Sequence, residues 1–264
     1  MRIALGITYC GAGLQGWQSQ PCGNTVQDHL ERALSEIAGE RIGVTGAGRT
    51  DAGVHASAQV AHFETGATRP QSAWVRGANA LLPASIAVQW ATAVPEDFHA
   101  RYAAASRAYR YVLYNHAVRP ALLAGLVGWF HLPLDAGKMR HAAQCLLGEH
   151  DFSSFRSSEC QAKNPVRKME EVRVSSRGPY LLLDFRANAF LHHMVRNLVG
   201  CLVYVGKGER SPQWLAELIA ARDRRQGAPT FSADGLYLSQ VRYDRRWGLP
   251  EFARVMPFEE DTPA

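Results

Sequence analysis

The spacing of apolar residues predicts a chain that mixes strands and helices. Within residues 2–9, Ile3, Leu5 and Ile7 recur at every second position, which predicts a strand over these residues with one buried face. Between residues 26 and 37 apolar side chains recur every three or four positions, which is the period of a helix. The same patterns predict further strands over residues 58–63, 86–94, 108–114, 168–175, 180–187 and 236–243, and helices over residues 72–81, 135–147, 191–205 and 211–219.

Local signals support several of these boundaries. Thr25 stands before a predicted helix with Asp28 three positions later, a variant of the capping box. Ser211 followed by Pro212 predicts an N-cap with proline at the first helical position. Between two strand patterns, residues 177–179 include a glycine and predict a hairpin turn.

The order of the elements predicts an α+β fold in two halves. A strand, a helix and two further strands in the first hundred residues are what a ferredoxin-like half contains, and the later elements repeat this order loosely. We predict an N-terminal domain over residues 1–104, a C-terminal domain over residues 105–250 and an acidic tail over residues 251–264.

A glycine-rich segment at residues 46–56 carries the clearest candidate chemistry. Its three glycines allow a tight loop that a bulky ligand can reach. Asp51 is the only acid between Glu40 and Glu64, and Arg49 beside it favours the ionised carboxylate. Such a carboxylate suits a nucleophile or a base, and it equally suits an aspartate that hydrogen-bonds its own turn.

The charge of the chain is distributed unevenly. Residues 1–100 hold 6 Lys+Arg against 8 Asp+Glu, whereas residues 101–264 hold 23 against 16. Only four of the 29 basic residues are lysines. Arginine binds phosphate bidentately and stacks on bases, so this bias suits RNA, although a preference for arginine codons explains it as well.

Cysteine spacing and hydropathy bear on the compartment. The five cysteines are odd in number and show no C-x-x-C spacing, which argues for reduced thiols in a cytoplasm. No apolar run approaches the roughly 20 residues of a membrane span, and the N-terminus leads into a strand without a signal peptide. We therefore expect a cytoplasmic protein with no membrane partner.

Asp51 lies in a motif, residues 48–56, that resembles the active-site motif of the TruA-type tRNA pseudouridine synthases. Other stretches resemble this family in the same order, so the resemblance covers nearly the whole chain: residues 9–18, 25–27, 98–101, 106–111, 151–155, 190–197 and 235–238. Two departures stand out. Cys10 replaces the family's usual aspartate, and residues 230–233 replace a Thr-Ala-Pro-Ala-like run.

The resemblance implies a fold, a reaction and partners. The two halves would join their sheets into one long, mainly antiparallel sheet flanked by helices, with a catalytic cleft between the halves. The protein would convert uridine to pseudouridine at positions 38, 39 and 40 of the tRNA anticodon stem-loop, without a cofactor. It would act as a homodimer.

The resemblance also implies roles for single residues. Asp51 would be the nucleophile, Tyr109 would stack on the flipped uracil, and Arg196 would pair with Asp51. Leu236 would form an apolar wall of the uracil pocket, and Arg49 would reach into the RNA stem. The alternatives are a packed tyrosine, a structural ion pair, an ordinary strand leucine and a loop-capping arginine.

Three arginines and four histidines allow further interpretations. Arg222, Arg224 and Arg225 follow a predicted helix, where they suit either the helix dipole or an RNA backbone. No metal-ligand spacing is present, so we expect no metal at the four candidate histidines, which are His55, His62, His192 and His193.

Two other functions stay open from the sequence. A non-catalytic tRNA-binding or chaperone protein would share the basic surface but would not need Asp51. A carboxylate-based nucleoside hydrolase would release free uracil, and would need a metal or a water-activating partner.

Overall fold

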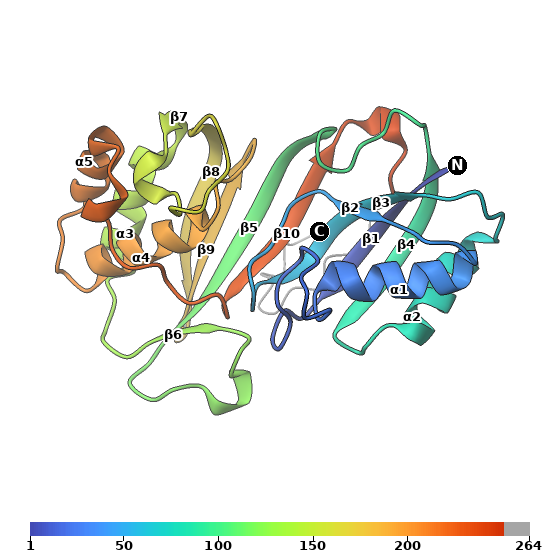
Figure 1. Cartoon of the computed structure of the whole chain (residues 1–264). Coiled ribbons are helices and arrows are strands. Elements are labelled where there is room, and N and C mark those ends of the chain that lie inside the picture. Colours follow the sequence, from blue (N-terminus) through green and yellow to red (C-terminus); the bar gives the residue numbers. More distant parts are fainter. Residues whose placement is uncertain (251–264) are drawn as a thin grey trace, which may run out of the picture. The chain divides into compact units, whose positions relative to one another are not determined.

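The computed structural model describes residues 1–250, so the predicted acidic tail at residues 251–264 lies outside the described residues. The chain forms two compact units (Figure 1). Met1–Ala105 and residues 238–250 form the first unit, and Ser106–Tyr237 forms the second.

The first unit is built on antiparallel strands with helices on one face (Figure 1). The central strand β1 pairs with β3 on one side and with β4 on the other, so that Leu5 lies opposite Ala61 and Ala91. The elements in chain order are β1 (Arg2–Tyr9), α1 (Val26–Ala38), β2 (Val44–Gly46), β3 (His55–Glu64), a π-helical turn (Ala73–Gly77), α2 (Ala78–Leu81), β4 (Ile86–Val94) and, after the second unit, most of β10 (Leu236–Tyr243).

The end of the described chain packs into the core of the first unit. Trp247 lies in one buried cluster with Val60, Trp90 and Phe98, and its ring is 5.3 Å from that of Phe98. The Tyr243 hydroxyl donates to the Ala100 carbonyl at 2.6 Å. Residues 238–250 therefore belong with the first unit, whereas the division predicted from sequence places them in the C-terminal half.

The predicted capping of α1 is confirmed. The Thr25 hydroxyl accepts from the Asp28 amide, and the Asp28 carboxylate accepts from the Thr25 amide. Gly39 closes the helix in a left-handed conformation, with φ of 73°.

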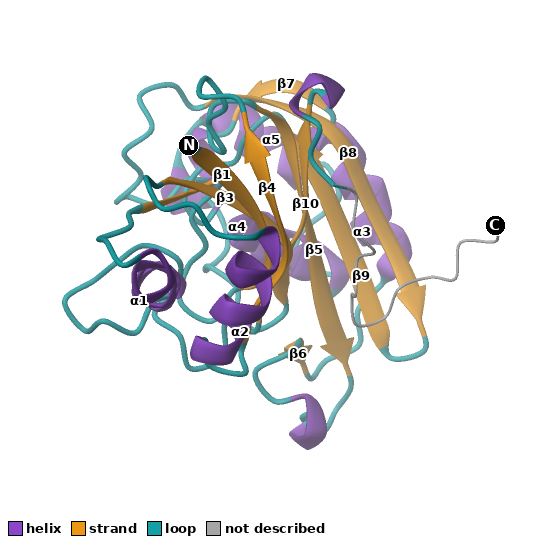
Figure 2. Ribbon diagram, turned by 90° about the vertical axis from the view of Figure 1, so that its right-hand side faces the viewer, coloured by secondary structure: helices purple, strands orange, loops and turns teal. Residues whose placement is uncertain are grey.

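The second unit has its own antiparallel strands, in the order β5-β9-β8-β7, with the short strand β6 parallel to β5. Helices α3, α4 and α5 lie behind these strands on one face (Figure 2). The bounds are β5 (Ala104–Asn115), β6 (Gly128–Phe130), α3 (Ala136–Ala143), β7 (Gly148–Asp151), β8 (Val166–Arg177), β9 (Tyr180–Ala187), α4 (Met194–Gly206) and α5 (Trp214–Ala221).

Two predicted helix starts are wrong. Helix α4 begins at Met194 rather than Leu191, because His193 adopts a left-handed conformation with φ of 61° that a helix cannot continue through. Helix α5 begins at Trp214, and Gln213 occupies its N-cap without a capping side chain, so Ser211 does not cap it.

The α+β class with mainly antiparallel pairing is confirmed. Strands β1, β4, β9 and β10 have the bounds predicted for them. Within residues 1–250 no helix combines the length and the apolar character needed to cross a membrane.

Candidate active site

Side chains from β1 and β3 hold the loop that carries Asp51. The Tyr9 hydroxyl lies 2.8 Å from the Thr50 hydroxyl, and both residues are buried. The Gln59 amide donates to the Gly48 carbonyl at 2.8 Å and lies 3.4 Å from the Tyr9 hydroxyl. Burial raises the pKa of Tyr9 to about 12, so this hydroxyl stays protonated at neutral pH.

A second loop, at residues 10–25, lies against the same segment. The Trp17 amide donates to the Thr50 carbonyl at 3.0 Å, and the Gly11 amide donates to Nδ1 of the buried His55 at 3.0 Å. A Cβ atom on Gly16 would lie 2.7 Å from the Thr50 carbonyl oxygen. The two loops thus approach so closely that only glycine fits at this contact.

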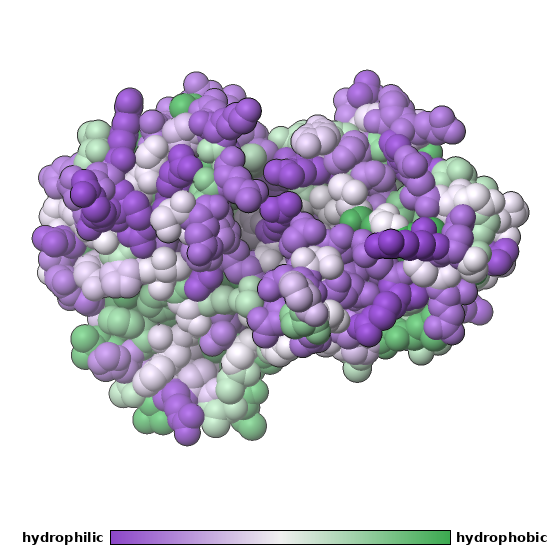
Figure 3. Space-filling model, viewed as in Figure 1, coloured by the Kyte–Doolittle hydropathy of each residue, from purple (hydrophilic) through white to green (hydrophobic). Residues whose placement is uncertain are grey.

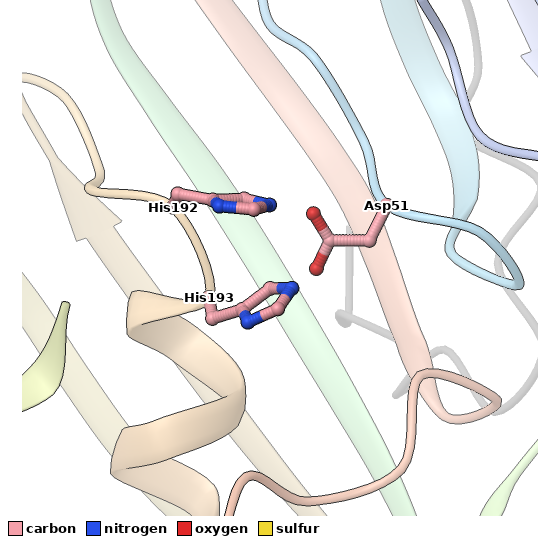
Figure 4. A group of neighbouring side chains, drawn as sticks. All are labelled: Asp51, His192 and His193. Carbon is pink, nitrogen blue, oxygen red and sulfur yellow. The ribbon is translucent and has the colours of Figure 1, made fainter. Parts of the chain in front are cut away.

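The contacts leave Asp51 and Arg49 on the outer side of the loop. Arg49 is exposed and Asp51 is half-buried, whereas Thr50 between them is buried. The turn after Asp51 is closed by the main chain, because the Val54 amide donates to the Asp51 carbonyl at 3.1 Å. Figure 4 shows the Asp51 side chain projecting from this loop.

In the second unit, Tyr109 and Tyr111 lie two residues apart on β5 and therefore on the same face. Tyr109 is packed edge-on against Phe190, with ring centroids 5.0 Å apart. The Tyr111 hydroxyl donates to the Ser232 carbonyl at 3.0 Å, and burial raises the pKa of Tyr111 above its usual range. Tyr111 is therefore a core residue that supports the segment leading into β10.

Arg196 and Leu236 meet this same segment from two sides. Nε of Arg196, in the first turn of α4, donates to the Phe231 carbonyl at 2.8 Å. Leu236 is buried at the start of β10. A Cβ atom on Gly235 would lie 2.3 Å from the Val112 carbonyl oxygen, so this glycine permits close packing on β5.

Thr230, at one of the two departures from the family pattern, takes part in a polar network. Oδ1 of the buried Asn197 accepts from the Thr230 hydroxyl at 2.7 Å and from Arg224 at 3.0 Å, and the Asn197 amide donates to the Phe155 carbonyl. The Arg224 guanidinium is therefore part of a hydrogen-bond network within the protein.

The other two candidate RNA-binding arginines are exposed and paired with acids. Arg225 forms a bidentate hydrogen bond with Asp223, and this bond is the main reason that the pKa of that carboxyl falls to about 2. Arg222 has φ of 50° at the C-cap of α5, and its Nε lies 3.5 Å from Asp151. Such exposed pairs are weak and can exchange for a phosphate.

His192 and His193 form the entry to α4 (Figure 4). Their rings lie 4.0 Å apart. Both main-chain carbonyls of this pair accept hydrogen bonds. The His192 carbonyl accepts from the Ser157 amide at 3.0 Å, and the His193 carbonyl accepts from the Asn197 amide at 2.9 Å.

Sequence reasoning missed the residues that hold the Asp51 loop. Tyr9 and Gly16 lie inside a stretch that resembles the family, but no supporting role is predicted for them. Thr50 is only part of the motif, and Gln59 is only part of a predicted strand. The available signal is that Gln59 is a polar residue in a run of apolar strand residues, where a buried amide needs a partner.

Comparisons with known proteins identify the family to which the chain belongs. A family model described as tRNA pseudouridine synthase matches residues 7–103 and 142–244. The chain is 58% identical over 258 residues to tRNA pseudouridine synthase A of Thiobacillus denitrificans, with 98% of this chain and 99% of the relative covered. It is 60% identical to the protein of the same name from Aromatoleum aromaticum, with 97% of each covered. The chain therefore belongs to the tRNA pseudouridine synthase family.

Proposed function

We propose that the protein converts uridine to pseudouridine at positions 38, 39 and 40 of the tRNA anticodon stem-loop, with Asp51 as its nucleophile. Family membership makes the protein an isomerase that acts on tRNA. The observation that carries the role of Asp51 is its placement, half-buried, on a loop whose neighbouring residue Thr50 is fixed by buried bonds. A reactive group needs this kind of support to hold its geometry.

The reaction needs no external reactant. The N1–C1′ bond of the uridine breaks, the uracil turns, and a C5–C1′ bond forms while C5 loses its proton and N1 gains one. Asp51 could first attack C1′, remove a ribose proton or add to the uracil ring, and each route ends in the same balance. The uridine must leave the RNA stack before any of these steps.

Four further side chains are proposed around the flipped uridine. Tyr109 would stack on the uracil, and its edge-on packing against Phe190 supports a fixed ring. Arg196 would hold the Asp51 carboxylate ionised, and its bond to the Phe231 carbonyl supports a fixed guanidinium. Leu236 would form the apolar wall, and exposed Arg49 would contact the RNA stem.

We also propose a homodimer in the cytoplasm. Apolar side chains gather on the surface over the segment that contains β6 (lower left of Figure 3), which supports contact with another protein chain. Leu122 there is 97% exposed, and Val118 and Leu132 are also exposed. All five cysteines are free thiols, which supports a reducing compartment. Sedimentation of the purified protein tests the dimer.

The decisive experiment compares wild type with Asp51→Asn on unmodified tRNA in the presence of EDTA. Pseudouridine is mapped by carbodiimide labelling and primer extension, and tRNA binding is measured in parallel. We expect wild type to modify the anticodon arm and Asp51→Asn to lose about 10³-fold or more of the rate, with tRNA binding retained. Glu36→Gln, which removes an exposed acid from α1, is the charge control and should match wild type.

Each competing function has its own outcome in this experiment. Binding without pseudouridine from either protein would leave a non-catalytic tRNA-binding module. Release of free uracil would indicate a hydrolase. Equal rates from wild type and Asp51→Asn would remove Asp51 from the mechanism while leaving the isomerase assignment in place.

A further inference from the structure

The turn at residues 99–103, between β4 and β5 in the first unit, carries an unusually exposed aromatic side chain. Tyr102 is 77% exposed, whereas Trp129, the other aromatic residue among the exposed large hydrophobic side chains of residues 1–250, is 40% exposed. This exposure leaves the Tyr102 ring accessible to a ligand.

Tyr102 is the outer end of a column of rings. Its ring centroid lies 4.3 Å from that of His99, which in turn lies 4.8 Å from that of His62. His62 is buried and contacts the fully buried Phe98 at 6.0 Å. We call these four residues, Phe98, His62, His99 and Tyr102, the aromatic column.

Hydrogen bonds hold the column rigid. Nδ1 of His62 accepts from the Ala100 amide at 3.2 Å. Nδ1 of His99 accepts from the amides of Arg101 at 3.2 Å and Tyr102 at 3.3 Å. Both imidazoles therefore act as acceptors in their neutral form, with the proton on Nε2. Burial is the largest of the effects that lower the pKa of His62 to about 4, so this imidazole stays neutral.

One arginine lies beside the exposed end of the column, and a second, Arg2, lies near its histidines and is paired with Glu64. The Arg101 guanidinium carbon lies 5.8 Å from the centre of the Tyr102 ring. Arg2 donates to the Phe98 carbonyl at 2.6 Å and also to the Glu96 carbonyl, so it anchors the chain just before the turn. After burial, the largest influence that lowers the pKa of His99 is the charge of Arg2, with a smaller contribution from Arg101.

We propose that the aromatic column is a binding site for an unpaired nucleobase of the tRNA, which stacks on Tyr102 while Arg101 contacts the adjoining phosphate. The site is additional to the uridine that reacts, and it rests on the proposed function because that function supplies the RNA. A base inside a helix already has neighbours on both faces, so only an unpaired base offers a free face to Tyr102. A cation beside an exposed ring matches a nucleotide better than it matches an aliphatic protein surface.

The test measures Kd for unmodified tRNA together with KM and kcat for pseudouridine formation. Tyr102→Ala is expected to raise Kd and KM on the order of 10-fold, with a much smaller change in kcat, because the base that stacks there is not the base that reacts. Tyr102→Phe keeps the aromatic face and should recover most of the lost affinity. Tyr102→Leu keeps the apolar volume without that face and should not.

Leu81→Ala is the matched control, because it truncates another exposed apolar side chain of the first unit, on α2. It should leave Kd, KM and kcat unchanged. Sedimentation of Tyr102→Ala checks whether the assembly is intact.

The outcomes separate this site from the proposed function. If wild type forms no pseudouridine, the proposed function fails. If wild type is active and Tyr102→Ala binds tRNA as wild type does, or if Tyr102→Leu recovers binding as well as Tyr102→Phe, the stacking site is wrong. If Tyr102→Ala changes the mass of the protein in solution, Tyr102 lies in an interface between copies of this chain, which also overturns the proposal.

Discussion

At the scale of the residue, the Tyr9 hydroxyl contributes hydrogen bonds in addition to the packing of its ring. It lies 2.8 Å from the Thr50 hydroxyl and 3.4 Å from the Gln59 amide, in a buried environment next to the proposed nucleophile. A buried polar group without a partner costs about 1–3 kcal/mol, so this group of side chains constrains the position of Thr50. Since Asp51 follows Thr50 directly, the same constraint acts on Asp51.

Tyr9→Phe keeps the ring and removes the hydroxyl. We expect the free energy of unfolding to fall by about 1–2 kcal/mol, because the Thr50 hydroxyl loses a buried partner. We expect kcat to fall roughly 10-fold with little change in KM, because a displaced Asp51 affects the reacting geometry more than tRNA binding. Denaturant unfolding and steady-state kinetics measure the two effects separately.

A double-mutant cycle identifies the partner. Thr50→Val removes the other hydroxyl, so adding it to Tyr9→Phe should cost less stability than it costs in wild type. A Tyr9→Phe protein that loses stability but keeps its full kcat would show that Tyr9 is structural and does not position Asp51.

At the scale of the element, two loops hold each other by close backbone approach. A Cβ atom on Gly16 would lie 2.7 Å from the Thr50 carbonyl, and one on Gly11 would lie 2.1 Å from the Val54 carbonyl. The loop at residues 10–25 therefore fits against the Asp51 loop only while glycine occupies these positions.

Gly16→Ala and Gly13→Ala form a matched pair that isolates this contact. Both glycines have positive φ, 83° and 79°, so alanine is strained by a similar amount at each. Only at Gly16 would the new methyl group meet the Asp51 loop, because nothing lies within 4 Å of a Cβ on Gly13. We expect Gly13→Ala to lose about 1–2 kcal/mol of stability from backbone strain, and Gly16→Ala to lose more because its methyl group also overlaps the Asp51 loop. Only Gly16→Ala should lose more than about 10-fold in kcat. Equal kcat values for the two would rule out the loop contact as a source of activity.

The elements also show what a sequence can and cannot predict. The bounds of β1 and β4 follow from alternating apolar residues, and the start of α1 follows from Thr25 and Asp28, because these signals are local. The three-residue strands β2 and β6 were missed, since their pairing with β3 and β5 depends on distant residues. Asp51 is proposed as the nucleophile because it lies in a local motif.

The support of Asp51 was not predictable in the same way. Gly16 and Thr50 are 34 positions apart and interact only after the two loops fold together. The left-handed His193 was missed for a related reason, because such a conformation in a non-glycine residue is imposed by its surroundings.

At the scale of the whole molecule, the first unit needs both ends of the described chain. Phe98 lies in the core of that unit, and its ring contacts those of Trp247 at 5.3 Å and Tyr243 at 5.5 Å. The intervening second unit, Ser106–Tyr237, is inserted between these two segments. The first unit is therefore completed only after the second has been synthesised.

Trp247→Ala tests this dependence. The substitution leaves a cavity against Phe98 and should cost about 3–5 kcal/mol in the first unit. By amide hydrogen exchange we expect β1 and β3 to lose protection while β8 and β9 keep theirs, since the second unit has a separate core. Trp129→Ala, which removes a 40% exposed indole from β6, should leave the protection of β1 and β3 unchanged. Equal loss of protection in both units would mean that they unfold as one cooperative body. The stability of the unit that carries Asp51 would then depend on both units.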